Sequence, residues 1–184
     1  MLQAVRNLEG VFLVGVEGVT EVWLVRHADA YTGGVDESDP GLSEVGHEQA
    51  GLLARRLRGG PVYSSPARRA LETARHISED PRIEPRVGEV TFDIVDGAFV
   101  FTEQPEEVVG RMSAAIDEIA AAHPGGRVVV VTHAGAITYY LTHVMELEPG
   151  RLRLLPHFTS INVVRALGYR RMVGAINDTA HLEP

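Results

Sequence analysis

Two short apolar runs that each end in a histidine constrain this chain more than any other feature. The first is VWLV at residues 22–25, which leads directly into Arg26 and His27, and the second is RVVVVT at residues 127–132, followed by His133. Continuous apolar runs of this length, bounded by polar residues, are typical of buried strands. Ligands of open parallel sheets bind beyond the carboxyl ends of the strands, so we expect both histidines at one functional edge.

The segments around these runs predict a sheet with helices on both faces. Helical spacing of apolar residues alternates with short strand-like runs, which is typical of a mainly parallel sheet. We therefore expect an α/β fold, a three-layer α/β/α sandwich with a mainly parallel central sheet. Helices are expected from Ser43 to the Gly59-Gly60 pair, from Ser65 and Pro66 onward, and at 105–122 and 134–145; strands are expected at 61–64, 86–95, 161–166 and 171–176.

Length and composition favour a single ordinary domain, which we expect over residues 21–184. Residues 1–20 are expected to form an N-terminal extension, either an edge strand or a flexible arm; an arm can cross to a second copy, so a homodimer is possible. The net charge of −8 argues against nucleic acid as a partner, and the lack of cysteine excludes disulfides and thiolate catalysis. No signal-peptide pattern and no run near the ~20 apolar residues of a membrane span occur, so no membrane partner and a cytoplasmic location are expected.

Basic side chains are predicted to converge at one edge of the sheet. Arg26 and His27 follow one strand, His133 follows another, and a third strand leads to Arg68 and Arg69 one turn into the next helix. Guanidinium groups, imidazoles and the N-termini of the helices expected to begin there suit a phosphate or a similar dianion. Each residue alone would more often be a satisfied polar side chain or part of a solvated helix face. A metal centre is not expected, because the nearby acidic residues lack metal-ligand spacing.

Four blocks in a fixed order carry a family resemblance: VWLVRHADA, LSEVGHEQA, VYSSPARRALETA and VVVVTHAGAI, followed by SINVV and NDTAHL. Together they resemble the histidine phosphatase superfamily, also called phosphoglycerate-mutase-like, and its short bacterial phosphatases in particular. The resemblance implies that His27 is the nucleophile that becomes phosphohistidine. It also implies that Arg26 and Arg69 bind the phosphate, and that His133 holds the phosphoryl group and stabilises charge. The helix that begins at Ala134 is expected to add a phosphate-binding amide.

The resemblance also points to a proton donor, in the segment RVGEVTFDIVDG at residues 86–97. This segment is similar to the family's acid block, with Glu89 as the acid. Asp93 and Asp96 stand where that block has a Gly and a Glu, so either aspartate can share the role. Gly33 is a further departure, because many members have an Asn at this position, which contacts the phosphate.

These residues predict a metal-independent phosphomonoester hydrolase without a cofactor, because fixed cations and positioning suffice for phosphoryl transfer. One carboxyl group can protonate the leaving alcohol and later activate water. The connection from Glu89 to His133 has room for one helix, shorter than in the mutases, which favours hydrolysis of a small phosphorylated metabolite. Two alternatives stay open: a protein phosphohistidine phosphatase and a non-catalytic phospholigand-binding module. Specificity is expected to depend on the loops at 31–39 and 94–103.

Overall fold

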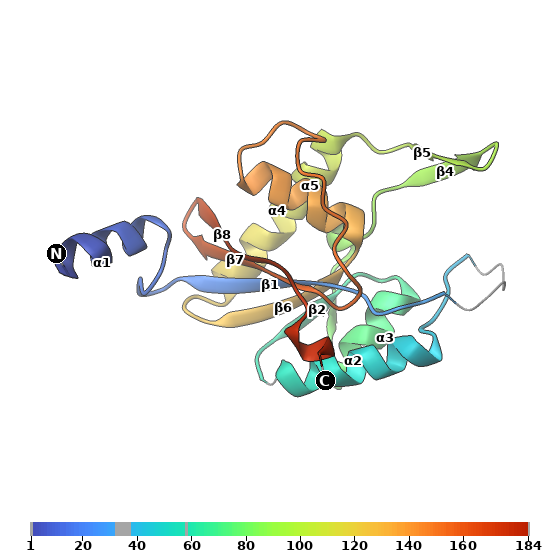
Figure 1. The fold of residues 1–184 in the computed structure, drawn as a ribbon, viewed down its shortest axis with the longest axis horizontal. Coiled ribbons are helices and arrows are strands. Elements are labelled where there is room, and N and C mark those ends of the chain that lie inside the picture. Colours follow the sequence, from blue (N-terminus) through green and yellow to red (C-terminus); the bar gives the residue numbers. More distant parts are fainter. Residues whose placement is uncertain (1, 32–37, 58, 184) are drawn as a thin grey trace.

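A computed structural model describes residues 2–31, 38–57 and 59–183 of the chain, and its centre is a six-stranded sheet (Figure 1). The strands are β1 (Thr20–Arg26), β2 (Val62–Ser64), β3 (Arg82–Ile83), β6 (Arg127–Thr132), β7 (Ile161–Leu167) and β8 (Arg170–Asp178). Their order is β3-β2-β6-β1-β7-β8.

Strands β3, β2, β6 and β1 run parallel to one another, and β7 pairs antiparallel with both of its neighbours, β1 and β8. β1 and β6 lie side by side in the middle, with Val22 opposite Val128 and Arg26 opposite Thr132. Because they are covered on both faces, these two strands are apolar at consecutive positions rather than at alternate ones. The predicted mainly parallel sheet is confirmed.

Helices cover both faces of the sheet, as predicted. In Figure 1, α4 (Pro105–Ala122) and α5 (Ala134–Val144) lie above the sheet, and α2 (Glu44–Arg56) and α3 (Arg68–Ile77) lie below it. Alternate strand residues enter the two cores: Leu24 and Val130 pack with α4 and α5, and Val25 and Val131 pack with α2 and α3. The two buried clusters make the fold a three-layer sandwich.

The helix starts follow local capping chemistry, with one difference from the prediction. The Ser43 side chain accepts a hydrogen bond from the Gly46 amide and caps α2, as expected for an N-cap serine. The second helix, α3, begins at Arg68 and not at Pro66. The expected cap, Ser65, is buried; its hydroxyl oxygen accepts from the Ala67 amide at 3.3 Å, ahead of the helix, and lies 2.8 Å from His133 Nε2.

The single strand predicted at 86–95 is wrong. A short 3-10 helix (Pro85–Val87) is followed by β4 (Phe92–Val95), which pairs with β5 (Ala98–Phe101) in a hairpin that projects from the body (Figure 1). Asp96 and Gly97 form its turn, both with positive φ (50° and 78°). This conformation suits an Asp-Gly hairpin turn whose twist matches the strands.

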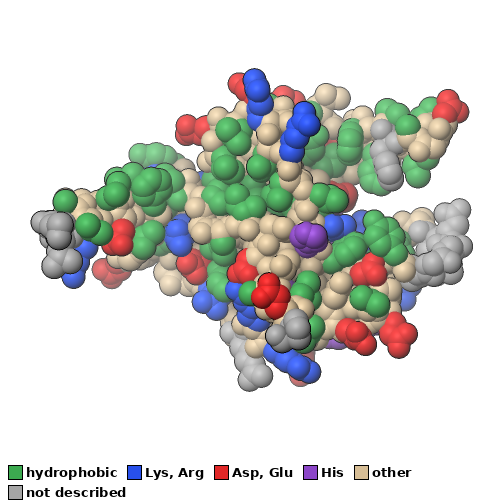
Figure 2. Space-filling model, in the orientation of Figure 1, with side chains coloured by type: hydrophobic (Ala, Val, Ile, Leu, Met, Phe, Trp, Pro, Cys, Tyr) green, Lys and Arg blue, Asp and Glu red, His purple; other side chains and the backbone are tan. Residues whose placement is uncertain are grey.

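Residues 2–11 of the N-terminal extension form a helix, α1 (Leu2–Val11), and not the edge strand that was one of the two predicted alternatives; the other, a flexible arm, stays a prediction. It extends from one end of the molecule, and Figure 2 shows hydrophobic side chains along it. Val5, Leu8 and Val11 recur every three residues, which suits a helix, and all three are exposed. Arg170 donates a hydrogen bond to the Val11 carbonyl at the helix end.

A short 3-10 helix (Ala180–Leu182) follows β8. Among the helices of the described residues, none combines the length and the apolar character that a membrane-spanning segment needs.

Candidate active site

His27 follows β1 and presents one ring nitrogen as an unprotonated base. Its backbone amide donates to the carbonyl of Thr132 on β6, at 2.9 Å, which fixes the backbone just beyond the sheet. Its Nδ1 lies 2.8 Å from the carbonyl oxygen of Ala28. A carbonyl can only accept, so Nδ1 carries the hydrogen and the lone pair is on Nε2.

His133 lies beside His27 because β1 and β6 are adjacent and parallel. The two ring centroids are 5.1 Å apart, in an edge-to-face arrangement, and His133 is fully buried. Its Nε2 lies 2.8 Å from the Ser65 hydroxyl oxygen, at the end of neighbouring β2. Three adjacent strands therefore end at the same place.

Arg69 joins the two histidines. Its Nε donates to His27 Nε2 at 3.2 Å, and its Nη2 lies 3.3 Å from His133 Nδ1. A guanidinium only donates hydrogen bonds, so both imidazole nitrogens that face it are unprotonated. Arg68, one residue earlier, instead directs its Nε to Glu72, so the structure brings Arg69 and not Arg68 to the histidines.

Both imidazoles are neutral in this arrangement. Burial lowers the pKa of His27 to about 3, and the charges of Arg69 and Arg26 act in the same direction. Burial also lowers the pKa of His133 well below its ordinary value, with smaller contributions from His27 and Arg69. A neutral histidine whose Nε2 is unprotonated is the form that can attack phosphorus.

Arg26 forms one wall of the site together with the segment at 156–158. Its Nη1 donates to the Pro156 carbonyl at 2.7 Å, and its guanidinium carbon lies 3.9 Å from the ring centre of Phe158. The same ring lies 5.7 Å from the ring of His27. The Arg26 Nε is buried and finds no acceptor among the described residues. A buried donor without a partner is costly, so this nitrogen is suited to receive an anion.

Glu89 lies at the N-terminus of α5, next to His133. Its Oε1 accepts from the Val90 amide at 2.9 Å and the Ala136 amide at 3.1 Å, and its Oε2 accepts from the Gly135 amide at 3.4 Å. A Cβ atom on Gly135 would lie 2.7 Å from Glu89 Oε1, so only glycine leaves room for the carboxylate here. The carboxylate thus accepts hydrogen bonds from two amides in the first turn of the helix that begins at Ala134.

The alternative acids lie elsewhere. Asp93 is on β4 and Asp96 is in the hairpin turn, both exposed on the projecting hairpin. The N-terminus of α3, which we expected to bind phosphate, is occupied by Asp39, whose carboxylate accepts from the Arg68 amide and lies 3.6 Å from Arg69. Gly33 and the rest of residues 32–37 lie outside the described residues.

Several residues of the site were missed in the sequence. Ser65 contacts His133, and the Thr73 hydroxyl oxygen accepts a hydrogen bond from the Ala28 amide at 2.9 Å, next to His27. Phe158 packs on His27 and Arg26 from a loop before β7. Ser65 had a sequence signal, since it directly follows the third strand, whereas the position of Phe158 depends on how the loop returns to the sheet.

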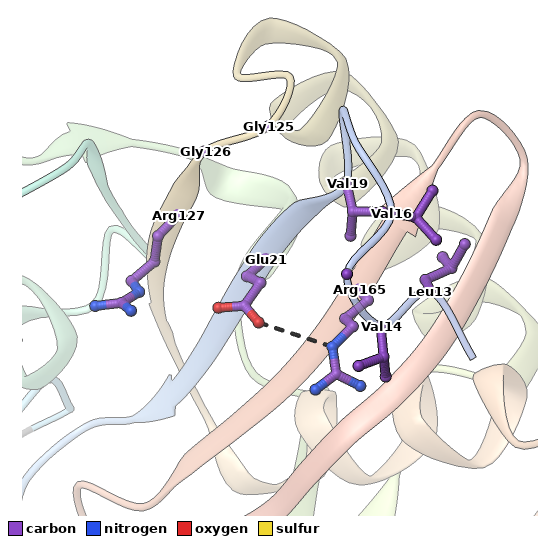
Figure 3. Close-up of a pocket in the computed structure, with 10 residues that line it drawn as sticks. Leu13, Val14, Val16, Val19, Glu21, Gly125, Gly126, Arg127 and Arg165 are labelled. Carbon is purple, nitrogen blue, oxygen red and sulfur yellow. Dashed lines mark ion pairs between the residues drawn. The ribbon is translucent and has the colours of Figure 1, made fainter. Parts of the chain in front are cut away.

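A hollow lies at the opposite end of β1, and none of the residues that line it is a histidine. This pocket of about 410 Å³ is lined by the 13–16 loop and by Glu21, Arg127 and Arg165 (Figure 3). Glu21 pairs with Arg165 at 3.7 Å, and the three residues sit opposite one another on adjacent strands. This row is an ordinary cross-strand charge arrangement. Within the described residues, no group of three or more His, Asp or Glu side chains is arranged to hold a metal ion.

The fold and site define an α/β protein with two histidines and two arginines at the carboxyl ends of its parallel strands, and the comparisons identify its family. The sequence model of the histidine phosphatase superfamily (branch 1) matches residues 22–100 and 95–179, so the chain belongs to this superfamily. The chain is 29% identical over 205 residues to a metal-independent phosphoserine phosphatase of Arabidopsis thaliana, with 89% of this chain and 84% of that protein covered.

Solved structures show the same fold. A phosphoserine phosphatase of Entamoeba histolytica, crystallised with phosphoserine, is similar with a TM-score of 0.74 and 17% identity over 89% of this chain and 100% of that one. A phosphoglycerate mutase of Bacillus anthracis gives a TM-score of 0.75 and 20% identity over 90% and 96% of the two chains. The predicted superfamily and the predicted phosphatase activity are confirmed.

Proposed function

We propose that this phosphatase hydrolyses small phosphomonoesters in two steps, with His27 as the residue that carries the phosphoryl group. In the first step, the Nε2 lone pair of His27 attacks phosphorus and the bond from phosphorus to the ester oxygen breaks. Glu89, in its protonated form, gives its proton to the departing oxygen, so the alcohol leaves neutral. Splitting the transfer in this way replaces one difficult displacement with two easier ones.

The charge that develops on the phosphoryl oxygens is stabilised by groups already in place. Arg69 and Arg26 supply fixed positive charge, and the buried Nε of Arg26 gains its acceptor. The Ala134 amide donates from the N-terminus of α5. The dianion also favours a protonated His133, which can then donate to a phosphoryl oxygen while Ser65 accepts its other N–H. Donors held in position at such a site are a large source of catalysis.

In the second step, water attacks the phosphorus of phosphohistidine from the side that the alcohol left. The Glu89 carboxylate takes a proton from this water, so the acid of the first step becomes the base of the second. The bond between phosphorus and Nε2 breaks, inorganic phosphate leaves, and His27 returns to its neutral form. Protons and charges are then as they were at the start.

The contact of the Arg69 guanidinium with both histidines is the observation that best supports this proposal. One guanidinium donates to His27 Nε2 and to His133 Nδ1, within 3.3 Å of each. Because both nitrogens must be lone-pair acceptors, the same contact places the nucleophile in its reactive tautomer and a cation beside it. Phosphoryl oxygens that enter between these groups can replace the imidazoles as acceptors for Arg69.

The decisive assay is hydrolysis of p-nitrophenyl phosphate in the presence of EDTA. We expect turnover by the wild type, none above background for His27→Ala, and a fall of about 100-fold for Arg69→Met, as for the loss of one charged stabilising group. Arg68→Met is the matched control, since Arg68 is adjacent on the helix and does not contact the histidines; it should keep most of the activity. Full activity in His27→Ala would contradict the proposal.

Glu89 is tested by the dependence on the leaving group. p-Nitrophenolate leaves without much help, whereas a serine alkoxide needs a proton. We expect Glu89→Gln to lower kcat/KM for phosphoserine at least ~10-fold more than for p-nitrophenyl phosphate. Equal losses on the two substrates would show that another group is the acid, and Asp93→Asn and Asp96→Asn would be examined next.

The first natural compound to test is phosphoserine. It is the substrate named for the Arabidopsis relative and the ligand in the Entamoeba structure. We expect it to be turned over faster than a protein carrying phosphohistidine, because the site takes a small phosphorylated metabolite. A homodimer and a cytoplasmic location stay predictions.

A further inference from the structure

We propose that Arg111 and Glu103 form a positioning pair that holds Glu89 against α5 for proton transfer. This inference rests on the proposed role of Glu89 as the acid. Arg111 lies on α4 and contacts neither histidine through any hydrogen bond; it acts on the segment at 86–91 that carries Glu89. Nothing in its sequence context separates it from an ordinary solvent-facing helix residue.

Arg111 uses all five of its N–H groups. Nη1 donates to the carbonyls of Arg86 at 2.7 Å and Gly88 at 2.8 Å, and Nη2 donates to the carbonyl of Glu89 itself at 3.1 Å. The two remaining groups, on Nε and Nη2, bind Glu103 at 2.6 and 3.0 Å. An arginine has five donors in a rigid plane, so this pattern leaves its orientation no freedom.

Glu103 completes the pair from the other side of the hairpin. Its carboxylate is mostly buried, and hydrogen bonds from Arg111 hold its pKa below the ordinary value. Its Oε2 also accepts from the Thr91 amide at 3.3 Å. Since Thr91 precedes β4 and Glu103 follows β5, the pair ties both ends of the projecting hairpin to α4 (Figure 1).

The carbonyls of residues 86–89 in the Glu89 segment accept their hydrogen bonds from side chains. Thr132, the residue before His133, donates to the Val87 carbonyl, and Arg111 takes the carbonyls on either side of it. Val87 and Val90 are buried in the core and fix the depth of the segment. Arg111 therefore restricts the remaining motion of the segment, which is the rotation that carries the Glu89 carboxylate toward or away from the α5 amides.

The expected consequence concerns geometry rather than charge. Without Arg111, the carbonyls of residues 86, 88 and 89 lose their partner and the segment relaxes. A misplacement of about 1 Å can cost ~100-fold in rate, and here the loss should fall on the step that needs the acid. A lysine offers a single ammonium point, which cannot reach three carbonyls and a carboxylate together.

The experiment compares kcat/KM for phosphoserine with that for p-nitrophenyl phosphate in Arg111→Met, Arg111→Lys, Glu103→Gln and Glu89→Gln. Glu103→Gln keeps the shape of the side chain, so the two kcat/KM values can still be compared in this variant even where Arg111→Met fails to fold. Asp117→Asn is the matched control, because Asp117 is also an α4-side partner of an arginine, Arg171, but lies away from the Glu89 segment.

We expect Arg111→Met and Glu103→Gln to lower the phosphoserine value ~10-fold or more beyond the p-nitrophenyl phosphate value, with Asp117→Asn unchanged. Combining either variant with Glu89→Gln should add little further selectivity, because both act through one carboxyl group. Equal losses on both substrates, alongside a selective Glu89→Gln, would overturn the positioning role and leave the proposed function intact. A non-selective Glu89→Gln would instead remove the acid assignment, and this inference with it.

Discussion

The close approach of Glu89 to α5 makes Gly135→Ala an informative substitution. A Cβ at this position would lie 2.7 Å from Glu89 Oε1 and 2.8 Å from Val90 Cγ2, both far inside normal contact. Val90 is buried, so it has little room to yield. The carboxylate must therefore move away from the Gly135 and Ala136 amides.

The magnitude follows from comparison with two other helical glycines. Gly51 on α2 and Gly110 on α4 have nothing within 4 Å of an added Cβ. Alanine at those two positions should stabilise the protein by ~0.5–1 kcal/mol, because glycine loses more backbone entropy on folding. Gly135→Ala should instead destabilise it by ~1–3 kcal/mol, as typical for overpacking.

The assay is urea unfolding of the three variants, together with their kcat/KM for phosphoserine and p-nitrophenyl phosphate. We expect only Gly135→Ala to lose phosphoserine turnover selectively, by about 10-fold or more, because only it displaces Glu89, the proposed acid. If Gly135→Ala matched Gly110→Ala in stability and in phosphoserine turnover, the reasoning that ties Glu89 to α5 would be refuted.

Three further predictions concern the histidines and Arg26. The pKa of His27 is about 3 in the folded protein and near 6.5 in the unfolded chain. Its contribution to stability is therefore complete above pH ~6.5 and falls by ~1.4 kcal/mol per pH unit below that pH. Urea unfolding should show this acid loss, about 2 kcal/mol by pH 5, reduced in His27→Asn; identical pH dependence would contradict it. Ser65→Ala should lower kcat ~10-fold and the free energy of unfolding by ~1–3 kcal/mol, because it leaves a His133 ring nitrogen without its hydrogen-bond partner. Unchanged kcat and unchanged stability would show that this contact contributes to neither. Arg26→Met should weaken competitive inhibition by inorganic phosphate ~10-fold or more, and undiminished inhibition would place the phosphate elsewhere.

Patterns set by local physics were predictable from the sequence. The consecutive apolar residues of β1 and β6 indicate strands covered on both faces, and the histidines that follow them indicate the functional edge. Helix α4 begins at Pro105 as expected, since proline suits the first turn of a helix. Arg69 could be chosen over Arg68 only through the resemblance, and the structure gives the physical reason, its contact with both imidazoles.

Of the remaining features, the hairpin has a turn signal in the sequence, and the others depend on tertiary contacts. The Asp96-Gly97 pair is a hairpin turn signal directly after the segment predicted as a single strand, residues 86–95. Arg111 could not be recognised, because its partners are carbonyls 22 to 25 residues earlier in the chain. The contact of Ser65 with His133 spans 68 residues and needs β2 and β6 to be neighbours.

The central claim is that Nε2 of His27 receives the phosphoryl group, and rapid-quench mapping of the phosphorylated protein tests it most directly. In Glu89→Gln with p-nitrophenyl phosphate, the first step needs little acid and the second lacks its base, so the phosphoenzyme should accumulate. We predict phosphate on His27, bonded to Nε2, because Nδ1 is held by the Ala28 carbonyl. Phosphate on another side chain, or a first turnover of p-nitrophenol without any phosphohistidine, would contradict the account.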